Sequence, residues 1–134
     1  MAQQSHVVDC FYQALGNKDL AGAQACCTPD AEFWHNFDAV AQTLEQASQG
    51  WSGMFQHFQQ HRVVDIERQI LSDESIVQRH LFLLAGEDGV LKGKACCIFV
   101  SLEQGLIKRL DEYINLAGDL AVDQVNPITA GLVR

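Results

Sequence analysis

The sequence predicts an α+β domain in which N-terminal helices cover one face of a curved sheet. Up to His61, apolar residues recur mostly at helical spacing, whereas the rest of the chain consists of β-rich runs joined by short polar turns. Helices and strands that are segregated along the chain are typical of the α+β class. The 134 residues, 48% of them hydrophobic, suffice for one domain with a buried core.

The first part of the chain predicts two helices and a short strand. Ser5 can cap a helix with apolar residues from Val7 to Leu15, and Gly16–Asn17 ends it. Asp19 opens a second helix, which runs through Ala25. A turn at residues 28–30 precedes the extended segment 31–36 (AEFWHN), which places Phe33 and His35 on one face.

The middle and end of the chain predict a long helix followed by a four-strand meander. Residues 43–59 carry a broad apolar stripe at helical spacing, and strands are expected at 62–71, 75–85, 91–102 and 105–117. Short polar turns at 72–74, 87–89 and 103–105 favour antiparallel neighbours. Residues 119–134 have no clear period, so we expect a domain over 1–118 and a disordered tail or docking arm over 119–134.

The charge and the N-terminal sequence exclude several classes of partner. The net charge is -8, and the charges are scattered, which argues against binding to nucleic acid or to an anionic membrane surface. The first residues lack the charged start and apolar run of a secretory signal, and no apolar run approaches the ~20 residues that span a bilayer. We therefore expect a cytoplasmic protein.

The five cysteines do not form a recognisable metal site or disulfide framework. They occur as Cys10 and the adjacent pairs Cys26–Cys27 and Cys96–Cys97. Neighbouring residues point to different faces of a strand or helix, so neither pair suits zinc. We expect reduced, apolar filler residues and neither a metal nor a cofactor.

The last predicted strand carries a carboxylate in an apolar setting. Alternation over residues 105–117 places Glu112 on the same face as Leu110 and Ile114. An ionised carboxylate is costly to bury there unless a partner compensates it, so Glu112 is a candidate site residue. The alternative is that this face is only half covered and Glu112 reaches solvent.

Three motifs carry a resemblance to a known superfamily: FYQALGNKDL (11–20), TPDAEFWHN (28–36) and IKRLDEYIN (107–115). Together with these motifs, the order of the predicted elements resembles that of the nuclear transport factor two superfamily. That group contains SnoaL-like polyketide cyclases, ketosteroid isomerase, scytalone dehydratase and limonene-epoxide hydrolase. The resemblance covers Val7 to Ala117 and implies a cone, in which helices and a curved antiparallel (mixed) sheet enclose an apolar pocket. It also implies a homodimer formed through the outer sheet face and a small apolar molecule as the partner.

The functional residues of these relatives match the chain only in part. The arginine and aspartate that activate water in limonene-epoxide hydrolase correspond to Arg79 and Glu112, but its proton-donating aspartate corresponds to Leu81. The general base of ketosteroid isomerase corresponds to His35, and its two oxyanion donors correspond to Phe11 and Cys97. Phenylalanine cannot donate a hydrogen bond and a thiol donates weakly, which excludes steroid isomerisation by that route.

The resemblance therefore implies an acid–base cluster of His35, Arg79 and Glu112 facing one cavity, with the arginine keeping the carboxylate ionised. The reaction would be isomerisation, cyclisation, dehydration or hydration. The alternatives are a buried ion pair that only closes the cone, or a ligand-binding or dimerisation module without chemistry. His80 is expected on the outer face, and Tyr12 would reach the pocket only if the first helix is rotated by one residue. The expected pocket residues are Phe11, Phe33, Trp51, Phe55, Leu81, Cys97, Leu110 and Ile114.

Overall fold

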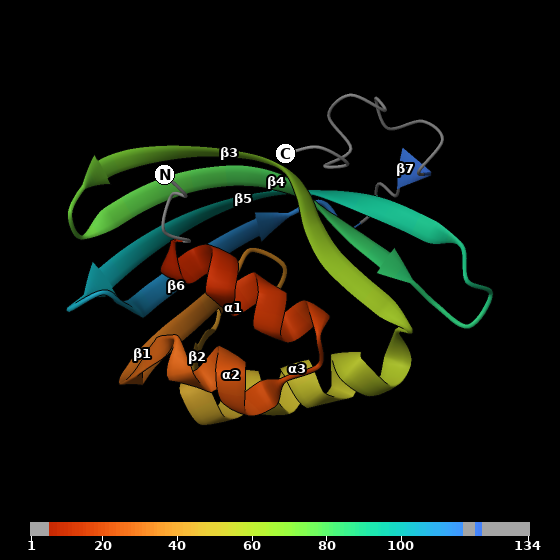
Figure 1. Ribbon diagram of the computed structural model, residues 1–134, viewed down its shortest axis with the longest axis horizontal. Helices are drawn as coiled ribbons and strands as arrows, with labels where there is room; N and C mark the ends of the chain where they lie inside the picture. Colours follow the sequence, from red (N-terminus) through yellow and green to blue (C-terminus); the bar gives the residue numbers. More distant parts are fainter. Residues whose placement is uncertain (1–5, 117–119, 122–134) are drawn as a thin grey trace, which may run out of the picture.

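The computed structural model describes residues 6–116 and 120–121, and it confirms the α+β class. The helices lie against the concave face of a curved, mixed sheet that does not close into a barrel (Figure 1). Of the predicted tail, only β7 (Leu120–Ala121), which pairs with β5, belongs to the described residues.

The N-terminal helices begin at side chains that cap them. Helix α1 (Val7–Gly16) starts at His6, whose Nδ1 accepts from Val8 N (3.1 Å) while Asp9 Oδ2 accepts from His6 N (3.2 Å). The cap thus lies one residue beyond the predicted Ser5. Helix α2 (Leu20–Ala25) begins after Asp19, as expected, and that carboxylate accepts from Gly22 N. Such caps satisfy amide groups that have no partner inside the helix.

Strand β1 (Cys27–His35) is longer than predicted and includes the residues expected to form a turn. It is followed by the short strand β2 (Ala41–Thr43), which the sequence did not predict. Helix α3 (Leu44–His57) starts with reciprocal bonds between Thr43 and Gln46.

The predicted meander is present as β3 (Gln60–Ser72), β4 (Ser75–Ala85), β5 (Leu91–Glu103) and β6 (Leu106–Ile114). Gln104 and Gly105 both have positive φ and join β5 to β6 by a two-residue turn. The sheet order is β2-β1-β6-β5-β4-β3, and β1 runs parallel to β6, which makes the sheet mixed.

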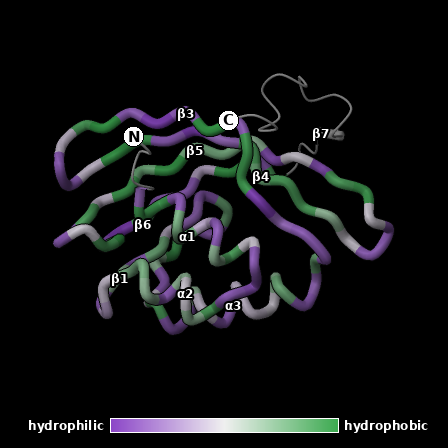
Figure 2. Tube along the Cα trace, in the orientation of Figure 1, coloured by the Kyte–Doolittle hydropathy of each residue, from purple (hydrophilic) through white to green (hydrophobic). Residues whose placement is uncertain are grey.

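The core lies between the concave sheet face and the helices. Its members include Phe11 of α1, Phe33 of β1, and Ile98, Ile107 and Leu110 of the meander, each at most 3% exposed. Figure 2 shows hydrophobic and hydrophilic residues alternating along the strands, as expected where each strand has one face on the core. No helix in the part of the chain that the structure describes is long and apolar enough to cross a membrane.

Candidate acid–base site

Glu112 and His35 come together on the concave face because β1 and β6 are parallel neighbours. The two residues are register partners, so their side chains project from the same face of the sheet. His35 Nε2 lies 3.5 Å from Glu112 Oε1, and the side chains are 21% and 15% exposed, respectively. The structure thus brings two of the three residues of the expected cluster within reach of one another.

Burial changes the protonation of this pair. Desolvation raises the pKa of Glu112 to about 7, because the charged carboxylate is costly in an apolar setting. Desolvation also lowers the pKa of His35, although Asp38 partly opposes it. Both shifts favour the uncharged forms, a carboxylic acid and a neutral imidazole, and above about pH 7 Glu112 becomes a carboxylate.

Arg79 does not belong to this group, and its expected position was wrong. It is exposed on the convex face, where its Nη2 lies 2.8 Å from Glu67 Oε1, and Glu67 raises its pKa. Its register partner Cys97 shares that face with Tyr113, which is 46% exposed. Leu81 lies two residues along the same strand face, so Leu81 and Cys97 do not line the cavity either.

His80, which was expected on the convex face, points into the cone. It is only 4% exposed, and its ring meets the ring of Tyr12 edge-on at 5.2 Å. The two faces of β4 are about equally apolar, so periodicity alone could not assign them. The sequence signal for the correct assignment was that arginine is the harder of the two side chains to bury.

A small cavity lies between the helices and this part of the sheet. Its volume is about 100 Å³, and its lining includes Glu112 and His35 together with Phe11, Tyr12, Leu15, Phe33, Trp51, Met54, Phe82 and Leu110. Four of the expected pocket residues are among them, whereas Phe55 and Ile114 belong to the interior without lining it. Tyr12 also lines the cavity, beside Phe11. The sequence had suggested this position for Tyr12 only if the first helix was rotated by one residue.

Four larger surface hollows, of about 490 to 650 Å³, open elsewhere on the described part of the chain. None of the four is lined by Glu112 or His35. We assign the candidate site to the smaller cavity, because the adjacent Glu112 and His35 side chains line it together with several aromatic rings.

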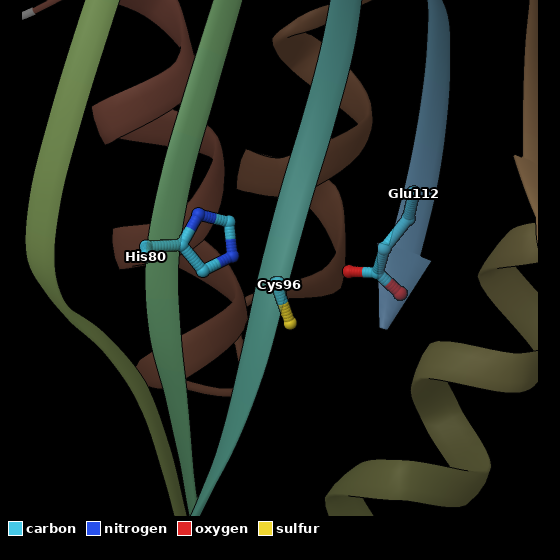
Figure 3. A group of neighbouring side chains, drawn as sticks. All are labelled: His80, Cys96 and Glu112. Atoms are coloured by element: carbon cyan, nitrogen blue, oxygen red, sulfur yellow. The ribbon is translucent and has the colours of Figure 1, made fainter. Parts of the chain in front are cut away.

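His80, Cys96 and Glu112 form a second grouping beside the cavity. They project from the neighbouring strands β4, β5 and β6, with Cys96 between the other two (Figure 3). Their ligand atoms all lie within 4.8 Å of one another, a separation that permits a metal ion to bind. Desolvation raises the pKa of Cys96, so its thiol stays protonated at neutral pH. Sequence spacing could not reveal this group, because its members are 16 residues apart on separate strands.

Replacing Arg79 with methionine tests its position directly. Because the guanidinium lies on the convex face and pairs with Glu67, we expect Arg79→Met to leave the binding of small molecules in the cone unchanged. Titration of a bound ligand followed by tryptophan fluorescence, which reports on Trp51 beside the cavity, would measure this. An affinity loss of tenfold or more would show that Arg79 belongs to the binding site after all.

Comparison with known proteins agrees with the fold. The sequence model of the SnoaL-like domain matches residues 8–110. No curated protein matches the chain at the sequence level. Eight similar solved structures share 10% to 17% identity with it, so they bear on the fold and leave the activity open.

Three of these structures illustrate the kinds of protein that share the fold. A hypothetical protein with a ketosteroid isomerase-like fold from Catenulispora acidiphila, in complex with trimethylamine, superimposes with a TM-score of 0.73 at 10% identity, over 86% of this chain and 89% of that one. A putative polyketide cyclase from Xanthomonas campestris superimposes with a TM-score of 0.69 at 16% identity, over 82% of this chain and 88% of that one. A limonene-epoxide hydrolase-like enzyme from M. tuberculosis superimposes with a TM-score of 0.68 at 16% identity, over 82% of this chain and 80% of that one.

Proposed function

Since this chain belongs to the SnoaL-like domain family, we propose that it binds a small, mostly apolar molecule in its cone and moves a proton on it through Glu112. The observation that carries the proposal is a carboxyl group with a pKa of about 7, in contact with His35 at the wall of an aromatic cavity. A group whose pKa lies near the working pH is effective both as an acid and as a base.

The roles of the two residues follow from their protonation. Above pH 7 the Glu112 carboxylate accepts a proton from a bound water or an acidic C–H group, and the neutral His35 beside it can accept or donate the next one. The reaction classes that fit are isomerisation, cyclisation, dehydration and hydration. Polyketide cyclases and an epoxide hydrolase among the similar structures fit the same range.

The size of the cavity limits the ligand. At about 100 Å³ it is smaller than the several hundred Å³ that enclose drug-sized ligands, so it admits a compact molecule or one end of a longer one. The trimethylamine bound by the Catenulispora protein is a molecule of that scale.

A thermal-shift panel of small ketones, lactones and epoxides tests binding, with the Arg79→Met variant as a control outside the cavity. We expect at least one chemical class to raise the melting temperature of both proteins. Proton NMR then measures whether that compound is converted. A flat panel would favour the second candidate, a non-catalytic module that acts through its surface.

The pH dependence of turnover tests the role of Glu112. If the ionised carboxylate is the base, kcat/KM rises with pH and levels off above a midpoint near 7, which is the pKa of Glu112 in the folded protein. A profile with a midpoint near the unperturbed 4.5 would contradict this assignment. Measurement at substrate concentrations far below KM isolates the free enzyme's ionisation.

We also propose that the convex sheet face forms a homodimer. Phe99 and Tyr113 lie there, 48% and 46% exposed, and Tyr113 also contacts Trp34 at a ring distance of 5.2 Å. An exposed aromatic cluster of this kind suits an interface between two copies. Sedimentation equilibrium should show a dimer for the natural chain and a monomer for Phe99→Glu.

A further inference from the structure

A chain of polar side chains connects helix α1 with the interior of the cone. The two terminal nitrogens of Arg68 donate to the two carboxylate oxygens of Asp9, and Arg68 Nε donates to Gln78 Oε1 (2.8 Å). Gln78 Nε2 lies 3.1 Å from His80 Nδ1. Gln78 is completely buried and the Arg68 side chain is 18% exposed, so these two residues are largely shielded from water, whereas the Asp9 side chain is 36% exposed.

The direction of each hydrogen bond follows from the guanidinium. Arginine can only donate, so the Gln78 atom that faces it must be the oxygen. The amide nitrogen of Gln78 therefore faces His80 and donates, which requires a lone pair on Nδ1. A neutral imidazole with a lone pair on Nδ1 carries its hydrogen on Nε2.

His80 is held neutral as well as in one tautomer. Burial, followed by the positive charge of Arg68, lowers the pKa of His80 to about 4. Its Nε2 is buried and makes no hydrogen bond to any part of the chain that the structure describes. That nitrogen points toward Cys96 and Glu112 (Figure 3), so a buried donor without a hydrogen-bond partner among the described residues faces Glu112, which lines the cavity, although His80 itself is not among the lining residues.

We propose that Asp9, Arg68 and Gln78 are positioning residues that hold His80 as its Nε2–H tautomer, so that His80 donates a hydrogen bond to an oxygen of the ligand beside Glu112. The inference rests on the proposed function and deepens it. It specifies an uncharged ligand that carries a hydrogen-bond acceptor, such as a carbonyl oxygen, at the end that reaches Glu112. A buried donor left without such an acceptor is energetically costly, which makes the ligand oxygen a specificity requirement.

The same tautomer disfavours a metal ion at His80, Cys96 and Glu112. A metal needs the lone pair of Nε2, and that position carries the hydrogen. Freeing it would require Gln78 to turn its NH₂ group toward Arg68, where two donors would face one another.

Nitrogen NMR of the ligand-free protein at pH 8 tests the tautomer. The protonated and unprotonated ring nitrogens of histidine resonate far apart, so a spectrum assigned by comparison with His80→Gln reads the tautomer directly. We expect the hydrogen on Nε2 in the natural chain. In Gln78→Glu the new carboxylate would accept from both Arg68 and His80, so we expect the hydrogen on Nδ1. Gln69→Glu, which adds the same charge at an exposed position of β3, should leave the tautomer unchanged.

Binding measurements test the ligand half of the inference. With cyclohexanone and γ-butyrolactone as probes, we expect Gln78→Glu to weaken binding about tenfold, the loss of one hydrogen bond, and Gln69→Glu to have no effect. Cyclohexane, which lacks the oxygen, should bind equally to all three proteins. Equal ketone affinities in the natural chain and Gln78→Glu would overturn the donor role of His80.

The outcomes separate this inference from the function on which it rests. Ketone binding together with an Nδ1–H tautomer in the natural chain would overturn the inference alone. A flat compound panel with an Nε2–H tautomer would refute the proposed function and the ligand contact, while upholding the role of Asp9, Arg68 and Gln78. Addition of Co²⁺ to the natural chain should give no cobalt–thiolate absorption, and a strong band that disappears in Cys96→Ser would overturn the tautomer assignment.

Discussion

Replacing Glu112 with glutamine is expected to stabilise the protein at pH 8 and to abolish proton transfer. The folded protein raises the pKa of this carboxyl from 4.5 to about 7, so the folded state binds the proton more tightly than the unfolded state does. The contribution of Glu112 to stability is therefore fully present below about pH 4.5 and is lost as the pH rises through 7. The difference between the two pKa values corresponds to about 3 kcal/mol of folding free energy. Glutamine is neutral at every pH, so the variant does not lose this free energy as the pH rises.

Urea denaturation at pH 5 and pH 8 measures this effect. We expect the free energy of unfolding of Glu112→Gln to exceed that of the natural chain by up to about 3 kcal/mol at pH 8 and by about 1 kcal/mol or less at pH 5. Glu87→Gln, in the exposed turn after β4, is the matched control and should change neither value. Loss of stability in Glu112→Gln at pH 8 would mean that the ionised carboxylate makes a favourable contact in the folded protein.

The second large effect is expected when the ring of Phe33 is removed. Phe33 is 2% exposed and its ring contacts those of Phe11 and Trp51, at centroid distances of 6.1 and 5.1 Å. Truncating a buried phenylalanine to alanine removes its burial and leaves a void, which costs about 3–5 kcal/mol. The void would join the existing cavity, so the variant should accept bulkier ligands.

Denaturation and a ligand series of increasing size would check both consequences. Phe33→Leu, which retains most of the apolar volume, should cost about 1.5 kcal/mol or less. Phe99→Ala is the control, since its ring is exposed on the convex face, and we expect a change within about 0.5 kcal/mol in a dilute, monomeric sample. A Phe33→Ala cost below that of Phe33→Leu would show that the aromatic cluster does not hold the cavity open.

The sequence predicted the elements well because strong periodic patterns determine them. The helices around Phe11 and Trp51 and the meander from β3 to β6 appeared where their apolar spacing placed them. Strand β2 was missed because three residues are too few to show a period. Strand β1 begins earlier than predicted because Thr28–Pro29–Asp30 suits a turn as well as the irregular stretch of β1 between Cys27 and Glu32.

The candidate site was less accessible to sequence reasoning. Glu112 could be identified because its own strand shows a carboxylate between two aliphatic side chains, and this depends on neighbours two residues away. His80 could not, because the two faces of β4 are similarly apolar, and only the packing against α1 decides between them. The contact between Asp9 and Arg68 joins residues 59 positions apart, and nothing local in either segment indicates it.

Strand β3 carries one more residue than its partner opposite His80. The register passes from Val64–Leu81 to Glu67–Arg79, so three steps on β3 match two on β4, and Asp65 adopts a φ of 54° at this bulge. The additional residue acts as a frame shift for every side chain that follows it on the strand. In the unshifted frame the inward position opposite Gln78 would hold the carboxylate of Glu67, and the guanidinium of Arg68 would face outward.

The frame therefore determines the chemistry of the cavity. A carboxylate accepts where a guanidinium donates, so it would turn the amide of Gln78 around, present the amide oxygen to His80, and move the imidazole hydrogen from Nε2 to Nδ1. Deleting Asp65 would not make this change, because two steps on each strand would then separate the Val64–Leu81 pair from the Glu67–Arg79 pair, and Arg68 would stay opposite Gln78. The change requires that the bulge be lost while Asp65 stays in the strand, and a site that donates a hydrogen bond would then offer a lone pair, the form that binds metal ions.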